Sequence, residues 1–365
     1  MIRFTLLLSV FISLQVSLYA QNDDLLAGVP GYEAIQWSDK LPEGLLTARS
    51  AVFVKLPDLP DGRRPDWKEL ATRAQKGFQQ IGIDAMAWYY LDDITAGTDA
   101  TATYMDYLKQ RRVEYILLLT QERDGSFRTV ITTFEGKEYV FNPAGQAASR
   151  FQASSPDKLM REVYKQTLRE DLSRSNILIN DFPEYFSASN IVRGKSFKRY
   201  NPDLKIDKMA FPLFNEFAVE MRKDAQATEF GDITLSGEDI RMQAMLQEAY
   251  PFEYGLVEYE IGEKEIRNLG YQFVFMYLKT TGKTIRQMLG MEVSEQETDY
   301  VTTVHRGDQH SVKTIPVDQP VYKFYAKHIY TGDVYIGNEW DADLTWEDAF
   351  RNYIENMRVE LNVKP

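Results

Sequence analysis

Two adjacent carboxylates, Asp92 and Asp93, are the residues best placed by type and position to do chemistry. They follow the apolar stretch 85–91, which predicts a strand, and α/β folds hold ligands beyond the carboxyl ends of strands. A carboxylate there can act as the general base of a hydrolase or lyase. Adjacent strand residues point to opposite faces, however, so the two cannot form an acid–base pair in regular geometry. Loop solvation and capping of the next helix are the alternatives.

The other residue types used in catalysis form no constellation. His305 and His310 lie with Asp308 in a polar stretch whose spacing matches no standard metal motif, and a solvated hairpin loop is the alternative to a metal site. His328 alternates with aromatic residues in a predicted strand. The sequence has no G-x-S-x-G, G-x-G-x-x-G or Walker A motif. We therefore expect no catalytic residue, no metal and no cofactor.

Basic side chains gather in one short stretch of a chain whose formal charge is −12. Together with nearby aromatic rings, they can hold an anionic cell-wall polymer or an acidic protein surface, or they can simply be a solvated connection. The acidic balance argues against nucleic-acid binding, which needs Lys and Arg to neutralise phosphates. The predicted binding residues are Arg193, Lys195, Phe197, Lys198, Arg199, Asp92 and Asp93.

Strands and helices alternate through the first half of the chain, and these elements must position the candidate residues. Continuous apolar runs predict buried strands, and capping residues mark the starts of helices. The predicted elements are strand 51–56, a helix capped by Asp66, strand 85–91, a short helix around 104–108, strand 113–120, hairpin strands 127–134 and 138–142, and a helix capped by Ser155 with Pro156 at its first position.

The second half repeats this order of elements. It predicts strand 208–214, a helix capped by Ser236, strand 254–261, helix 263–269, strand 273–280, hairpin strands 321–330 and 333–337, and a final helix capped by Thr345. Insertions near 215–235 and 281–317 are needed to align the halves. We predict an α/β fold of two tandem Rossmann-like or anticodon-binding-like sheet-and-helix units. The alternative is that two unrelated α/β domains share this alternation.

The start of the chain reads as a secretory signal. A short positive start, an apolar stretch and an exit at Tyr19-Ala20 that ends on a small residue predict residues 1–20 as a cleaved signal peptide, and a retained anchor helix is the alternative. The predicted organisation is then a first unit at 21–172, a connection at 173–207 and a second unit at 208–365. The chain has no Cys, which excludes disulfides and a lipidated cysteine. We expect a periplasmic or secreted protein of a Gram-negative bacterium, with no membrane span after signal cleavage.

The last hairpin and helix resemble known domains. The stretch 330–337 reads Tyr-Thr-Gly-Asp-Val-Tyr-Ile-Gly and precedes a capped helix near the C-terminus. This pattern is similar to the end of small periplasmic α/β domains from envelope-assembly proteins. Examples are the curli-secretion lipoprotein, the penicillin-binding-protein activator lipoprotein and the N-terminal domain of the Tol propeller protein. The resemblance implies a domain that binds other proteins and is not an enzyme, although the lipidated Cys of the two lipoproteins is absent here.

These observations favour a non-enzymatic, soluble periplasmic scaffold or partner-binding protein of the cell envelope. The expected partner is an envelope protein or an anionic cell-wall polymer. A hydrolase or lyase that uses Asp92 or Asp93 as its base is the first alternative. A carbohydrate-binding protein with exposed Trp and Tyr side chains is the second.

Overall fold

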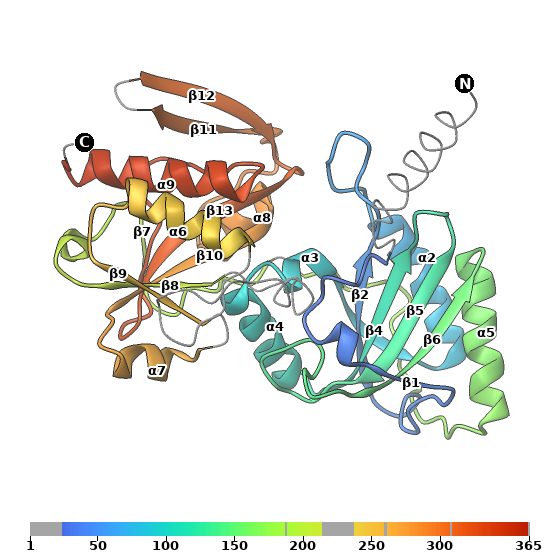
Figure 1. Ribbon diagram of the computed structural model, residues 1–365. Helices are drawn as coiled ribbons and strands as arrows, with labels where there is room; N and C mark the ends of the chain where they lie inside the picture. The colour runs from blue at the N-terminus through green and yellow to red at the C-terminus, as the bar shows by residue number, and fades with distance from the viewer. Residues whose placement is uncertain (1–23, 187, 214–236, 259–260, 307–308, 364–365) are drawn as a thin grey trace, which may run out of the picture.

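The chain folds into two six-stranded sheets with helices on both faces (Figure 1). The computed structural model describes residues 24–186, 188–213, 237–258, 261–306 and 309–363. Each sheet mixes parallel and antiparallel strands, so the predicted α/β class is confirmed. Within the described ranges, no helix combines the length and the apolar character needed to cross a membrane.

The first sheet has the strand order β1-β6-β5-β4-β2-β3. Its strands are β1 (Gln36–Ser38), β2 (Arg49–Lys55), β3 (Asp84–Tyr90), β4 (Val113–Gln121), β5 (Phe127–Thr133) and β6 (Ala147–Ala153), and the turn η2 (Tyr32–Ala34) precedes them. β2 is parallel to β3 and β4, β5 is antiparallel to both of its neighbours, and β1 is parallel to β6.

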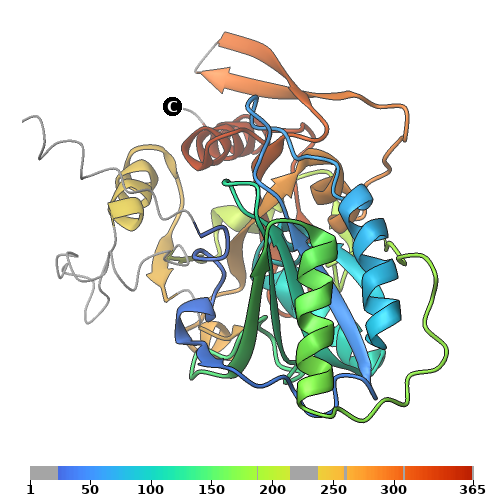
Figure 2. The ribbon, with the colours of Figure 1, turned by 90° about the vertical axis from the view of Figure 1, so that its right-hand side faces the viewer.

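Helices cover both faces of this sheet. On the outer face, α2 (Lys68–Ile81) and α5 (Pro156–Arg169) lie side by side (Figure 2). On the inner face, which is turned toward the second sheet, lie α3 (Leu91–Ile94) and α4 (Thr98–Gln110). Helix α5 begins as predicted, since the Ser155 hydroxyl accepts a hydrogen bond from the Lys158 amide and Pro156 is the first helical residue.

The second sheet has the order β7-β14-β13-β10-β8-β9. Its strands are β7 (Ser196–Phe197), β8 (Met209–Pro212), β9 (Tyr254–Val257), β10 (Phe273–Thr281), β13 (Pro320–His328) and β14 (Val334–Tyr335), and the turn η3 (Pro202–Lys205) lies between β7 and β8. Each position repeats the pairing sense of the first sheet, because β8 is parallel to β9 and β10, β13 is antiparallel to both neighbours, and β7 is parallel to β14.

Helices α6 (Gly237–Ala249) and α9 (Trp346–Glu360) cover the outer face of the second sheet, and α7 (Glu263–Asn268) and α8 (Gly282–Met288) cover its inner face. The hairpin of β11 (Asp299–Arg306) and β12 (Gln309–Pro316) lies beyond α9 (Figure 1). The predicted insertion 281–317 therefore contains α8 and this hairpin. The backbone register of its two strands pairs position 305 with position 310, the places of His305 and His310.

The inner faces of the two sheets share one hydrophobic core. Successive strand residues alternate between faces, so Phe53 of β2 lies in this core whereas Val52 and Val54 pack under α2 and α5. Leu278 of β10 and Tyr325 of β13 reach the same core from the second sheet. The two sheets therefore bury apolar area against each other in addition to packing on their own helices.

The predicted hairpin strand 138–142 is wrong, because β6 begins at residue 147. Val140 and Phe141 are apolar because they fill the inner core beside Tyr32, without joining the sheet. The predicted connection 173–207 contains β7, the edge strand of the second sheet. Ser236 and the predicted insertion 215–235 lie outside the described residues.

The backbones of the two halves come close together at Gly97. The Ala96 carbonyl accepts a hydrogen bond from the Lys279 amide at 2.7 Å, and a Cβ atom on Gly97 would lie 2.5 Å from the Tyr277 carbonyl oxygen. Gly97 has extended backbone with φ 169°, so its need for glycine comes from this contact.

We expect Gly97→Ala to lower the free energy of unfolding by about 1–3 kcal/mol, because the added methyl group has no room beside β10. Urea denaturation measures the change. Gly262→Ala is the matched control, since Gly262 has φ −72° and open space around it. Equal stability of the two variants would mean that the two halves do not approach this closely.

Candidate functional site

Asp92 and Asp93 occupy the short helix α3, directly after β3. They therefore lie at the carboxyl ends of β2 and β3, the edge at which α/β folds place ligands. Each of the two carboxylates has its own basic partner, Lys55 for Asp92 and Arg64 for Asp93. The strand geometry from which the sequence argued against an acid–base pair does not apply, because both residues lie on a helix.

Asp92 pairs with Lys55, the last residue of β2. The Lys55 ammonium donates to both carboxylate oxygens of Asp92, at 2.8 and 2.6 Å. The exposed fractions of the two side chains are 15% for Lys55 and 27% for Asp92. This ion pair therefore keeps partial contact with solvent.

Asp93 forms a more enclosed cluster that reaches the second sheet. The Arg64 guanidinium donates to both of its oxygens, at 3.1 and 2.8 Å. The Thr280 hydroxyl of β10 donates to Asp93 at 2.5 Å and lies 2.5 Å from Arg64. The guanidinium also stacks over the ring of Tyr90, 4.2 Å from its centroid. Asp93 thus joins the loop after β2, helix α3 and strand β10.

Electrostatics agree with a fixed ion pair at Asp93. Burial alone would lower the pKa of Arg64, but the charge of Asp93 and its hydrogen bonds outweigh burial and raise the pKa. Burial also raises the pKa of Tyr90 well above its ordinary value, so the phenol stays neutral and donates to the Leu56 carbonyl. The Asp93 carboxylate is occupied by its ion pair with Arg64, whereas a general base needs a carboxylate that is free to accept a proton.

We expect Asp93→Asn to destabilise the protein by about 2–3 kcal/mol, because it removes the ion-pair partner of the enclosed Arg64 guanidinium. Asp92→Asn is the matched comparison and should cost about 1 kcal/mol or less, since Lys55 keeps access to water. Chemical denaturation of both variants measures the difference. A hydrolase or lyase that used Asp92 as its base would instead lose turnover in a folded Asp92→Asn variant.

The predicted basic residues lie along β7 and its flanks. Arg193, Lys195, Lys198 and Arg199 are exposed, whereas the Phe197 ring is partly buried against Tyr335 of β14. The two rings are stacked, with centroids 5.2 Å apart and planes inclined by 12°. The predicted cluster is therefore placed on one margin of the second sheet, far along the chain from Asp92 and Asp93.

Most of this positive charge is not held in ion pairs between described residues, although Asp333 lies near enough to Lys195 for the two charges to interact. The Arg193 guanidinium lies 3.8 Å from Glu263, and the Arg199 guanidinium lies over the Phe197 ring at 5.8 Å. Among the described residues, Lys195, Lys198 and Arg199 form no ion pair. We name the exposed stretch Arg193–Arg199 the basic edge.

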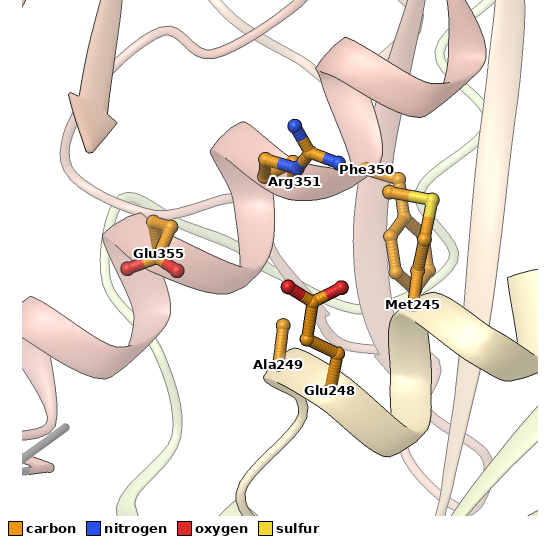
Figure 3. Close-up of a pocket in the computed structure, with 6 residues that line it drawn as sticks. All are labelled: Met245, Glu248, Ala249, Phe350, Arg351 and Glu355. Carbon is orange, nitrogen blue, oxygen red and sulfur yellow. The ribbon is translucent and has the colours of Figure 1, made fainter. Parts of the chain in front are cut away.

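A separate hollow lies between α6 and α9 and has a volume of about 220 Å³ (Figure 3). Its lining residues are Met245, Glu248, Ala249, Phe350, Arg351 and Glu355. Pockets for small organic ligands usually measure about 300–1,000 Å³. The hollow is smaller than that range, and it is distant in sequence from both predicted groups of residues.

Several residues that shape these sites were not predicted from the sequence. Arg64 and Thr280 complete the Asp93 cluster, and they are 216 positions apart in the chain. The only sequence signal was the Arg63-Arg64 pair in the irregular connection after β2. Among the residues that the structure describes, no group of three or more His, Cys, Asp or Glu side chains could hold a metal ion.

No protein-family model matches this chain, and no curated protein matches it. A function is therefore inferred from its own residues.

Proposed function

We propose that this protein is a non-enzymatic scaffold that binds a partner in the cell envelope, after export to the periplasm of a Gram-negative bacterium. The observation that carries the proposal is the contrast between the two predicted groups. Asp92 and Asp93 are held in ion pairs, whereas Arg193 is the only residue of the basic edge that forms an ion pair with another described residue. Charge-assisted contacts from such a surface suit an acidic envelope protein or an anionic cell-wall polymer.

Contacts between the two sheets support this role, because they hold the binding surface in a fixed position. The Asp93 cluster joins the two sheets on one side. On another side, Asp99 of α4 accepts hydrogen bonds from Lys327 and Tyr325 of β13, at 2.8 and 3.0 Å. With the shared core, these contacts fix the basic edge relative to the first sheet. Preorganisation lowers the entropic cost of binding a partner.

We also propose that the two sheets are tandem copies of one Rossmann-like or anticodon-binding-like unit. The equal strand order and equal pairing senses support this idea. The resemblance of the last hairpin and helix to periplasmic envelope-assembly domains, which bind proteins, agrees with the proposed role.

Photo-crosslinking in cells tests the proposed function. A benzophenone amino acid at Lys198 should give a specific adduct in the periplasmic fraction, and the adduct should disappear when Lys195 and Arg199 are replaced by Glu. The same amino acid at Lys165, which is exposed on α5, is the control. Absence of an adduct at Lys198, or an equal pattern at both positions, would contradict the proposal.

Carbohydrate binding is a second candidate because Trp37 of β1 is 46% exposed. The Arg150 guanidinium lies 4.7 Å from its ring centroid and adds a donor for sugar hydroxyl or carboxyl groups. Affinity electrophoresis in gels that contain envelope polysaccharide tests this function. Retardation that is lost in Trp37→Ala would support it, and unchanged mobility would exclude Trp37 as a sugar platform.

A further inference from the structure

Strand β7 presents an open edge. The Lys195 and Phe197 carbonyls accept hydrogen bonds from the Val334 and Ile336 amides of β14, at 2.8 and 3.1 Å. Backbone groups of successive strand residues point to opposite sides, so the N–H and C=O of Ser196 point away from β14. β7 is the last strand of its sheet, and no strand in the described part of the chain pairs with this outer side.

The edge is held in place before any partner arrives. The Gly194 amide donates to the Gly332 carbonyl at 3.0 Å, and the Lys195 amide donates to the Asp333 carboxylate at 2.7 Å. A Cβ atom on Gly194 would lie 2.7 Å from the Thr331 carbonyl oxygen, so this close fit requires glycine. A segment fixed in this way loses little conformational entropy when a strand adds to it.

Charge selects what can add to this edge. Lysines on an edge strand deter pairing with uncharged or basic strands. Here Lys195 and Lys198 flank Ser196, and Arg193 and Arg199 lie just beyond them. An acidic strand would instead gain both backbone hydrogen bonds and charge-assisted contacts with these side chains.

We propose that β7 is a docking edge for an extended, acidic segment of a partner protein, which adds as a further strand of the second sheet beside Ser196. This inference rests on the proposed function, because it names the partner chemistry of the same basic edge. The partner segment is rich in Asp and Glu, and its carboxylates lie beside the basic residues that border Ser196.

Binding of a labelled peptide tests the inference. The probe is a fluorescein-labelled dodecapeptide of alternating Glu and Thr, measured by fluorescence anisotropy with the full-length mature protein. The double variant Lys198→Glu/Arg199→Glu should weaken binding at least about tenfold, because attraction becomes repulsion. Added salt should weaken binding to the unchanged protein.

A proline at the edge separates strand addition from simple charge attraction. Ser196→Pro removes the outward N–H without removing a bond to β14, and edge strands tolerate proline where the N–H faces solvent. We expect about a tenfold loss of peptide binding, since the central backbone hydrogen bond is lost. Ser196→Ala keeps the N–H and should bind as the unchanged protein does.

A second measurement keeps the test decisive if Ser196→Pro does not fold. The same peptide with every backbone amide N-methylated cannot donate to a strand edge from either side, and it should bind the unchanged protein about tenfold more weakly. Equal binding of both peptides, or full binding by a folded Ser196→Pro variant, would overturn strand addition. A sulfated polysaccharide that binds the unchanged protein and the Ser196→Pro variant equally well, and displaces the peptide from both, would point to an anionic polymer. That result would also overturn strand addition.

The outcomes separate this inference from the proposed function. Crosslinking at Lys198 without any peptide binding would overturn the acidic strand and leave a partner-binding scaffold. Equal peptide binding by the unchanged protein and by the Lys198→Glu/Arg199→Glu variant would also overturn the inference. If the unchanged protein gives neither a crosslink at Lys198 nor peptide binding, both the proposed function and this inference are overturned.

Discussion

Replacing Lys323 with methionine is expected to destabilise the protein by about 3–5 kcal/mol, more than any other substitution proposed for this chain. Lys323 lies on β13 beneath α9, with 1% of its side chain exposed, and its ion-pair partner Asp341 is fully buried. The ammonium also donates to the Ile336 carbonyl at 2.9 Å. The variant leaves the carboxylate of Asp341 buried without its counterion.

The effect of Lys323→Met should grow with pH. Burial raises the pKa of Asp341 above its usual 3.8, although the neighbouring Lys323 acts in the opposite direction. Removing Lys323 raises that pKa further. A carboxyl with a raised pKa in the folded state is tolerated while it is protonated, and stability falls as pH rises above the unfolded pKa. Denaturation at about pH 5 and about pH 8 should therefore show the larger loss at the higher pH.

The double variant Lys323→Met/Asp341→Asn is the control. It removes both charges and keeps an amide that can accept from Asn356, which donates to the Asp341 carboxylate at 3.4 Å. We expect it to recover much of the lost stability and to lose the pH dependence, because no unpaired charge stays buried. A double variant less stable than Lys323→Met would contradict this explanation.

Lys327→Met is the second large prediction and should loosen the contact between the two sheets. Lys327 of β13 has 4% of its side chain exposed and binds both Asp99 of α4 and Glu263 of α7. Its removal leaves two carboxylates near each other in a mostly buried site. We expect a loss of about 2–3 kcal/mol, reduced from the value for a fully buried pair because Glu263 is 32% exposed.

Asp99→Asn is the matched variant, and it should lower the free energy of unfolding by less because Glu263 still neutralises Lys327.

The stability difference should also depend on pH. Burial raises the pKa of Glu263, but the hydrogen bond and charge of Lys327 outweigh burial and lower that pKa below 4.5. A carboxylate whose pKa is lower in the folded state stabilises the fold at pH values above its pKa in the unfolded state. This contribution to stability is lost as pH falls through the pKa of the folded state. The gap between the unchanged protein and Lys327→Met should therefore narrow below about pH 4. Guanidinium titrations followed by Trp fluorescence measure both effects, and equal losses in the two variants would contradict the role of Glu263.

The sequence predicted the buried strands well because their apolar runs have a direct physical cause. The prediction 113–120 corresponds to β4 (Val113–Gln121), a strand that is buried on both faces. Thr345 caps α9 as its position predicts, with its hydroxyl accepting from the Asp348 amide. Local patterns of this kind depend only on neighbouring residues.

Other features depend on contacts that local patterns do not contain. Val140 and Phe141 have the composition of a strand, but tertiary packing buries them without sheet pairing. The edge strand β7 is two residues long, which is too short for a periodic signal. The partners of Asp93 come from distant parts of the chain. Charge clustering could therefore identify the candidate residues, whereas their pairing required the fold.

The common core between the sheets has a consequence for protein preparation. A fragment cut within residues 173–207 would strip the cover from inner-face side chains such as Phe53, which is now fully enclosed. A contiguous apolar surface of this kind leads to aggregation or to pairing with another copy. Each half expressed by itself should therefore self-associate, and mixing the two halves should restore a one-to-one complex.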